Sequence, residues 1–301
     1  MNWILSLLWG IAAAGLAWHT ATIARQITYV TLADGRRQER RLPLSFRVLL
    51  PLAPNLAPLF ARNAFAAIHA RLARQIVAAG CEGLVTAQEI LALRILMPAV
   101  LGPLWLAAVY AMLLNVGSIP IARFGMVLYV LGPVWLFLYP GLWLKHAVTA
   151  RHMSMRRSLP FVLDVLTLSV EAGMDFMTAL RRHVETRRVD ALGEELIRTV
   201  REIQLGKTRR EALRDMSRRV DLADLRSVVN ALVQADELGV SIGTILRIQA
   251  DQIRQRRFER AERLAHEAPV KLLAPLLLFI FPSVFLILMG PIIARLIQQG
   301  F

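Results

Sequence analysis

Cysteine is nearly absent from this sequence, and a β-strand pattern is absent from its larger charged segment. The chain has one cysteine, Cys81, in 301 residues, so no intrachain disulfide can form and the fold needs no oxidising compartment. Residues 145–271 contain no alternating run of apolar and polar residues, which is the pattern of a half-buried strand. A disulfide-linked scaffold is therefore excluded, and a helical fold is expected.

Charge is absent from four long stretches of the chain. Residues 1–24, 95–120, 124–144 and 272–294 contain none of the 36 Lys and Arg and none of the 22 Asp and Glu. Each stretch reaches the roughly 20 residues that a helix needs to cross a hydrocarbon core. The whole chain is 56% hydrophobic, with a mean hydropathy of +0.48. We therefore predict an all-α, polytopic membrane protein with four transmembrane helices.

The first of these stretches has an alternative explanation as a cleaved signal peptide. Signal peptides carry positive charge before their apolar core. In residues 1–24 there is no charge before the core, and the first one, Arg25, follows it. We therefore predict a retained span.

The basic residues predict the orientation of the spans. Residues 25–94 contain 10 Lys and Arg and residues 145–271 contain 24, against one in the connection at 115–123. Because cytoplasmic segments collect Lys and Arg, both charged segments are predicted to be cytoplasmic and both termini periplasmic. The same bias accounts for the net charge of +14 without nucleic-acid binding. The predicted organisation is a first span (1–24), a small cytoplasmic helical segment (25–94), a transmembrane hairpin (95–144), a cytoplasmic antiparallel helical bundle (145–271), a fourth span (272–294) and a periplasmic tail (295–301).

Three junctions between predicted helices repeat every 33 residues within the larger charged segment. Each has a glycine that can end a helix in the left-handed conformation, at Gly173, Gly206 and Gly239. Two residues later each has Asp, Thr or Ser, which can cap the next helix. A period of this length can indicate a solenoid, but the tetratricopeptide and ankyrin signatures are missing and the repeat stops after three junctions. A compact antiparallel bundle is therefore predicted.

Two stretches of the bundle are predicted to be core helices. Residues 161–170 are apolar but too short to span a membrane, with Pro160 tolerated in the first turn. Residues 241–268 direct one apolar face toward the core and become densely charged before the last span; the core-facing residues are Ile242, Ile245, Leu246 and Ile253.

No catalytic, cofactor or metal site is found in the sequence. The triplet Gly206-Lys207-Thr208 is like the end of a phosphate-binding loop, but that loop needs a glycine where this chain has Arg201 in a predicted helix. The six histidines form no pair with metal-ligand spacing. The predicted spans contain no charged residue of the kind that marks an ion pathway, which disfavours a pump or carrier. We predict that the protein is not an enzyme.

Three acidic residues stand at predicted helix C-termini. Glu171, Asp236 and Glu237 lie two or three residues before the capping glycines Gly173 and Gly239, where the helix dipole disfavours negative charge by up to about 1 kcal/mol. One explanation is ion pairing with nearby arginines. The other is that these five residues contact a cytoplasmic partner, which makes them candidate site residues.

Arg256, Arg257 and Arg260 are further candidate contact residues. They lie in a dense basic stretch just before the last span. Such a stretch commonly meets anionic headgroups, at roughly 1 kcal/mol per basic residue. Docking of a protein partner is equally compatible with it.

The smaller charged segment is predicted to contain short helices. Pro43, Pro51, Pro54 and Pro58 break any long helix there, and Gly80 and Gly83 form a pair midway along it. We expect these helices to lie against the membrane face or against the larger segment.

Several separated stretches resemble a known family. They are Leu-Pro-Phe-Val-Leu-Asp-Val-Leu (159–166), Ser-Val-Glu-Ala-Gly (169–173), Arg-Arg-Glu-Ala-Leu-Arg (209–214), Ala-Leu-Val-Gln-Ala-Asp-Glu-Leu-Gly-Val-Ser (231–241), Pro-Val-Lys-Leu-Leu-Ala-Pro-Leu (269–276), Phe-Pro-Ser-Val-Phe (281–285) and Gly-Pro (290–291). Together they resemble the type II secretion F domain, in the single-domain form of TadC-like proteins of the Flp/Tad pilus system. The resemblance covers a little under half of the chain, and residues 1–94 match in layout only.

The resemblance implies an inner-membrane platform between a cytoplasmic hexameric secretion ATPase and pilin subunits. The platform would pair with a sister protein, TadB-like, in a homo- or hetero-oligomer. It would pass ATPase motion to pilins so that they leave the membrane and join the fibre, a role that needs no active site. The alternative is a membrane scaffold or receptor that binds a cytoplasmic regulator without transmitting force.

Overall fold

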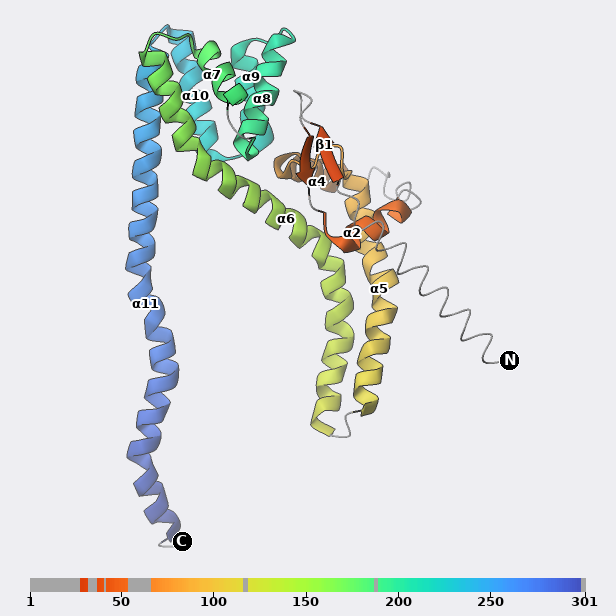
Figure 1. Ribbon diagram of the computed structural model, residues 1–301. Helices are drawn as coiled ribbons and strands as arrows, with labels where there is room; N and C mark the ends of the chain where they lie inside the picture. The colour runs from red at the N-terminus through yellow and green to blue at the C-terminus, as the bar shows by residue number, and fades with distance from the viewer. Residues whose placement is uncertain are drawn as a thin grey trace, which may run out of the picture.

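The computed structural model describes residues 28–31, 37–40, 42–53, 66–115, 119–186 and 189–298. These residues are almost entirely helical, which confirms the predicted fold class (Figure 1). Three helices are long and apolar enough to cross a membrane, within Ala87–Ala111, Val127–Glu171 and Ile242–Ile292. They correspond to the second, third and fourth predicted spans, whereas the first, residues 1–24, lies outside the described residues.

Helices α5 (Ala87–Asn115) and α6 (Ile119–Glu171) form the predicted hairpin. A ring nitrogen of Trp105 donates a hydrogen bond across the hairpin to the carbonyl oxygen of Leu128, at 3.2 Å. A Cβ atom at Gly132 would lie only 2.1 Å from that nitrogen. Small residues let membrane helices approach closely, and Gly132 serves this purpose here.

Helix α6 continues beyond the hairpin into the bundle, which corrects the prediction of a separate helix at 161–170. Pro160 lies inside α6 and not in a first turn. A proline removes one backbone hydrogen bond and often ends a helix. Here the helix continues because its flanking residues are packed in one core, with Leu159, Val162 and Leu163 at most 3% exposed. The predicted burial holds for one face of this stretch, while Phe161 and Leu168 on the other face are exposed.

The direction of α6 changes between the part beside α5 and the part in the bundle (Figure 1). The helix contains Pro133, Pro140 and Pro160. Sharp helix bends almost always occur at such residues, because each removes a backbone hydrogen bond. The bend brings the end of α6 to the far side of the bundle from the hairpin.

The bundle surrounds one apolar core of leucine, valine and methionine side chains. Leu180, Met216 and Leu246 are at most 2% exposed within it. The predicted core residues Leu246 and Ile253 are buried, and Ile242 packs partly against the same core. With α6 and the first part of α11 (Ile242–Gln298), the bundle contains α7 (Phe176–Thr186), α8 (Ala191–Gln204), α9 (Arg209–Val220) and α10 (Ala223–Leu238).

A second, smaller core lies where the hairpin leaves the bundle. It joins α5 and α6 to the short helices α2 (Leu44–Leu49) and α4 (Ala66–Ala79), and the 3-10 turn η1 (Leu50–Leu52) follows α2. Phe46 of α2 is fully buried, with its ring 4.7 Å from that of Trp143 and 6.0 Å from that of Tyr139. The predicted short helices are thus confirmed within 42–53 and 66–79.

A two-stranded antiparallel hairpin was not predicted. Strand β1 (Thr28–Thr31) pairs with β2 (Arg37–Arg40), with Thr28 opposite Arg40. The sequence contained a signal for it, because Thr-Tyr-Val-Thr favours a strand and Asp34-Gly35 between the two strands is a frequent hairpin-turn pair.

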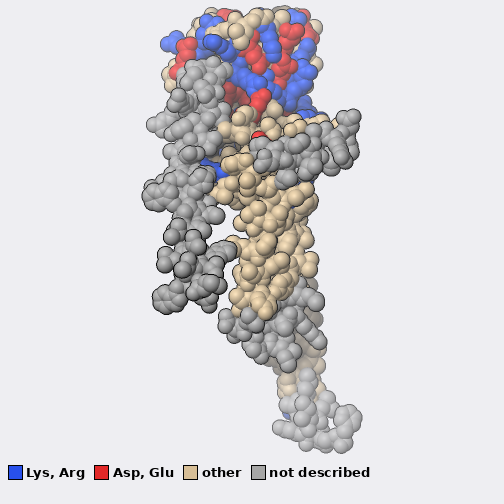
Figure 2. Space-filling view, turned by 90° about the vertical axis from the view of Figure 1, so that its right-hand side faces the viewer, with Lys and Arg blue, Asp and Glu red and all other residues tan. Residues whose placement is uncertain are grey.

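Helix α11 runs from the bundle through the last predicted span without a break. Its 57 residues correspond to about 86 Å at 1.5 Å per residue. No residue of its apolar window is buried against the rest of the described chain. The charged residues gather on the bundle, and the apolar parts extend away from them (Figure 2).

Candidate functional site

The three capping glycines lie at one end of the bundle. In an antiparallel bundle every second junction returns to the same end, so a repeat of 33 residues places Gly173, Gly206 and Gly239 together. Phe176, Arg209 and Ile242, from the starts of three different helices, line one small cavity there. We call residues 171–176, 204–209 and 236–242 the distal face, because they lie at the end of the bundle remote from the apolar part of α11 (Figure 1).

Backbone geometry at the distal face confirms the predicted caps. Gly173, Gly206 and Gly239 have φ values of 91°, 103° and 69°. The Gly173 amide donates to the Val170 carbonyl, and the Met174 amide to the Ser169 carbonyl, both at 3.0 Å. This pair of bonds ends a helix when a residue adopts the left-handed conformation, which glycine does without strain.

The next helices begin with the predicted side-chain caps at two junctions. The Asp175 carboxylate accepts a hydrogen bond from the Met177 amide at 2.9 Å. Thr208 and Glu211 form the reciprocal capping box. These bonds satisfy amides that a helix start would otherwise leave unpaired, so the junctions hold a defined shape.

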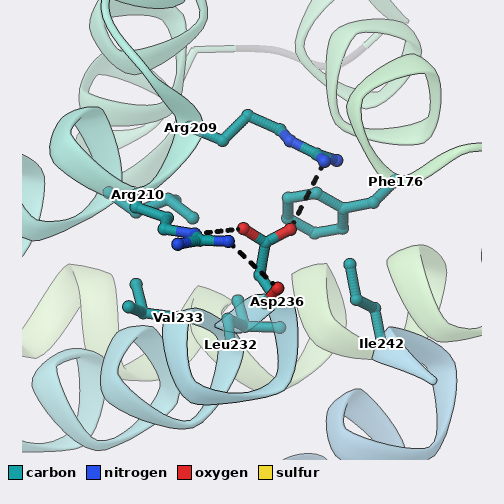
Figure 3. Close-up of a pocket in the computed structure, with 8 residues that line it drawn as sticks. Phe176, Arg209, Arg210, Leu232, Val233, Asp236 and Ile242 are labelled. Atoms are coloured by element: carbon teal, nitrogen blue, oxygen red, sulfur yellow. Dashed lines mark hydrogen bonds and ion pairs between the residues drawn. The ribbon is translucent and has the colours of Figure 1, made fainter. Parts of the chain in front are cut away.

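The acidic residues at the distal face are paired with arginines. Glu171 pairs with Arg247 at 2.8 Å, and Glu237 with Arg214 at 2.8 Å. Asp236 lies between Arg210 at 2.6 Å and Arg209 at 3.3 Å, as Figure 3 shows. The ion-pair explanation is therefore confirmed for all three acids. Whether Glu171, Gly173, Asp236, Glu237 and Gly239 also contact a partner stays a prediction.

Asp236 is held in its charged form by its arginines. The hydrogen bond from Arg210 lowers the pKa of Asp236 below its ordinary 3.8, and the charges of Arg209 and Arg210 lower it further. In the same way the hydrogen bond from Lys207 lowers the pKa of Asp215. Both carboxylates therefore stabilise the fold only while they are ionised.

We expect the bundle to lose stability as the pH falls through the acid range. A carboxylate with a lowered folded pKa contributes stability above its unfolded pKa, here 3.8, and loses that contribution as the pH falls through the folded value. Asp236→Asn should therefore lower the unfolding temperature at pH 7 and make it fall less steeply between pH 5 and pH 2. Unfolding of the detergent-solubilised protein, followed by circular dichroism, measures both effects.

Glu237→Gln is the control. The Glu237 side chain is 41% exposed, so its ion pair with Arg214 should contribute little to stability. Equal slopes for the parent and Asp236→Asn would contradict the prediction.

The cavity beneath Asp236 is too small for a ligand. It is lined by Phe176, Leu232, Val233 and Ile242 together with the two arginines (Figure 3). Its volume is about 10 Å³, which leaves room for no more than one water molecule. The distal face can therefore act through its outer surface, but this cavity holds no substrate.

The outer surface of the distal face exposes large apolar side chains. Leu205 is 75% exposed, Leu238 is 77% exposed and Val240 is 46% exposed. Contiguous exposed apolar side chains with a polar rim often mark protein contact sites. The two leucines were missed in the sequence, although each directly precedes a capping glycine, where a helix end has few core neighbours.

Arg256, Arg257 and Arg260 hold α11 against its neighbours in the bundle. Asp224, at the start of α10 and 8% exposed, lies 3.6 Å from Arg256 and 3.5 Å from Arg260. Arg257 donates a hydrogen bond to the carbonyl of Arg156 on α6.

These contacts lie far from the start of the apolar run at Leu272. Arg260 and Arg256 precede Leu272 by roughly 18 and 24 Å along α11. A headgroup layer is only about 5–8 Å thick, so the geometry favours contacts within the chain over contacts with lipid. A role of the three arginines in partner contact stays a prediction.

Within the described ranges, no group of three His, Cys, Asp or Glu residues could hold a metal ion. Many of the charged side chains instead form ion pairs between helices. Such pairs fix how the helices lie against one another.

Comparison with known families identifies the bundle together with the last span. Residues 162–290 match the family described as Type II secretion system (T2SS), protein F. This chain carries a protein F domain. The F domain begins near the C-terminal end of α6, includes α7 to α10, and ends in the apolar part of α11. No curated protein and no solved structure matches the chain.

The match confirms the predicted type II secretion F-domain family, whereas the TadC-like form stays a prediction. Proteins of this family are platforms in the inner membrane of secretion or pilus-type machines, and they generally work with an ATPase and partner platform proteins. The apolar helices and the F domain together indicate an inner-membrane protein of this kind.

Proposed function

We propose that this chain is the TadC-like platform subunit of a Tad/Flp pilus assembly machine. In this proposal it couples a cytoplasmic hexameric secretion ATPase to the extraction of pilin subunits and their assembly into a fibre. The resemblance of residues 159–291 to the single-domain F proteins supports the pilus class, and the F domain itself supports the platform role.

The observation that carries the proposal is the continuity of α11. The helix begins at Ile242 on the distal face, contributes Leu246 and Ile253 to the bundle core, and ends beyond the last apolar stretch. Between the bundle and the apolar stretch, α11 is a single exposed helix. Ion pairs within the helix, such as Lys271 with Glu267 at 2.9 Å, stabilise it there. A polar helix exposed on all sides is typical of a connection between two bodies. A force applied to the distal face would therefore reach the membrane through one continuous helix, in which Pro269, Pro275, Pro282 and Pro291 are the places where it can bend.

The distal face is the contact surface for the ATPase in this proposal. Leu205 and Leu238 offer exposed apolar surface, and Arg209, Arg210 and Arg214 add positive charge near the start of α9. Their ion pairs with Asp236 and Glu237 keep these arginines in place. The sister platform protein, TadB-like, and the pilins would contact the apolar spans, of which the one in α11 is left uncovered by the rest of the described chain.

A pair of variants tests contact and force transmission separately. A photo-crosslinking residue at Leu238 should capture the ATPase in living cells without breaking an ion pair. Combined replacement of Ala261, Ala265 and Ala268 by glycine should loosen the exposed part of α11, because each change costs a helix about 1 kcal/mol. We expect this triple variant still to capture the ATPase but to lose most surface pili, counted by electron microscopy.

The matched control replaces the same three alanines by glutamine, which is a good helix former. It changes the side chains but keeps the helix stiff, so piliation should survive. If the protein with the photo-crosslinking residue at Leu238 and no other change fails to capture the ATPase, the proposed contact is refuted. Normal piliation in the glycine variant, with capture retained, would favour the scaffold alternative.

A further inference from the structure

The described chain has two apolar cores, and α6 runs from one to the other. Leu144 belongs to the small core beside the transmembrane hairpin, and Met155 belongs to the core of the bundle. Both side chains are fully buried. Only a few turns of α6 lie between them. A single helix bends more easily than two packed elements, so this piece alone would be a compliant joint.

The turn between α4 and α5 forms a second contact across this joint. Gly80, with φ of 68°, ends α4: its amide donates to the Val77 carbonyl at 2.9 Å. Two residues later, Glu82 pairs with Arg198 of α8 at 2.6 Å. The turn thus leads directly into α5 and at the same time reaches the bundle.

A buried ion network lies under this turn. The Arg151 side chain on α6 is 5% exposed and lies 2.5 Å from Glu194 and 3.1 Å from Glu195, both on α8. Glu195 also lies 3.3 Å from Arg219 of α9. Charged groups in such a setting hold each other in fixed directions, because a buried charge that loses its partner is very unfavourable.

Gly80 fits against this network because it has no side chain. A Cβ atom at Gly80 would lie 2.1 Å from Nη1 of Arg151 and 2.4 Å from its Cζ. An exposed arginine could swing aside, but the Arg151 guanidinium is buried and held by two carboxylates. Gly83 provides a contrast: its φ is 81°, yet a Cβ atom there would meet nothing within 4 Å.

We propose that the α4–α5 turn is a clamp that locks the transmembrane hairpin to the bundle. Gly80 packs against Arg151, and Glu82 binds Arg198, so that the turn fixes α5 to the bundle at a point separate from α6, beside the packing of α4 against α9. The hairpin then follows each tilt of the bundle. The clamp is a property of this chain alone and does not depend on what the platform moves.

The clamp can be tested by measuring a distance between α5 and the bundle. In a Cys81→Ala background the only thiols would be Ile95→Cys on α5 and Arg201→Cys on α8, both at exposed positions. Pulsed electron spin resonance of spin labels at these sites, on the full chain in detergent, gives the distribution of distances. We expect a narrow distribution, and at least a twofold broadening in Gly80→Ala.

Gly83→Ala is the matched control, because it introduces the same backbone strain without the clash, and it should keep the narrow distribution. Glu82→Arg tests the clamp without backbone strain and should also broaden the distribution. Adding Arg198→Glu restores an ion pair of opposite order and should narrow it again. If Gly80→Ala and Glu82→Arg both remain as narrow as Gly83→Ala, the clamp does not exist. Because this measurement needs no ATPase or pilin, its failure is distinguishable from failure of the platform proposal.

Discussion

Replacement of Arg151 by alanine is expected to destabilise the protein by about 3–5 kcal/mol, because it removes the buried guanidinium that binds two buried carboxylates. Glu194 and Glu195 are 6% and 7% exposed, so water cannot replace the guanidinium. Arg219 would still face Glu195, but Glu194 would lose the partner that lies 2.5 Å away. Guanidinium titration of the full chain in mild detergent, followed by far-ultraviolet circular dichroism, gives the change in unfolding free energy.

Arg198→Ala is the control for this prediction. Arg198 also pairs with glutamates, with Glu82 at 2.6 Å and with Glu202 at 3.4 Å, but its own side chain is 40% exposed. Exposed pairs contribute about 0–1 kcal/mol, so this variant should unfold nearly as the parent does. A loss of equal size in Arg151→Ala and Arg198→Ala would show that burial does not set the strength of the network.

Leu246→Ala should cost about 2–5 kcal/mol, the range for removing a buried leucine side chain. Leu246 is fully buried and joins α11 to the core of the bundle. The cavity left behind weakens the place where the long helix is anchored, so piliation should fall together with stability. The same titration measures the stability, and pili are counted on cells that express equal amounts of the variant.

The matched control lies on the same helix. Ile248 is 53% exposed, so Ile248→Ala changes a similar side chain outside the core. It should unfold nearly as the parent does, since substitutions at the surface usually stay within about 0.5 kcal/mol. A large loss at Ile248 with little loss at Leu246 would mean that α11 packs in a different rotation.

The local parts of the fold could be predicted because their causes are local. A glycine that ends one helix and a hydroxyl or carboxylate that begins the next act within four residues, and so Gly173, Asp175 and Thr208 could be assigned from the sequence. The long apolar stretches were equally clear, since a span is defined by its own length and composition. The common position of the three junctions agrees with their equal spacing, but it was recognised only in the structure.

The remaining features depend on contacts that are distant in the sequence. The continuation of α6 through Pro160 is decided by the core on both sides of it, which overrides the local preference of proline. The pairing of Arg151 with Glu194 joins residues 43 positions apart, and the sequence offers many arginines and glutamates for such a pair. The same holds for Gly80. The sequence shows that it can cap a helix, but not that its backbone packs against the guanidinium of Arg151.

The length of α11 has a geometric consequence. A rod of about 86 Å behaves as a lever, and each degree of tilt at the distal face would displace its opposite end by about 1.5 Å. A rotation of a few degrees would thus shift a lipid-embedded neighbour by a distance close to one helical turn.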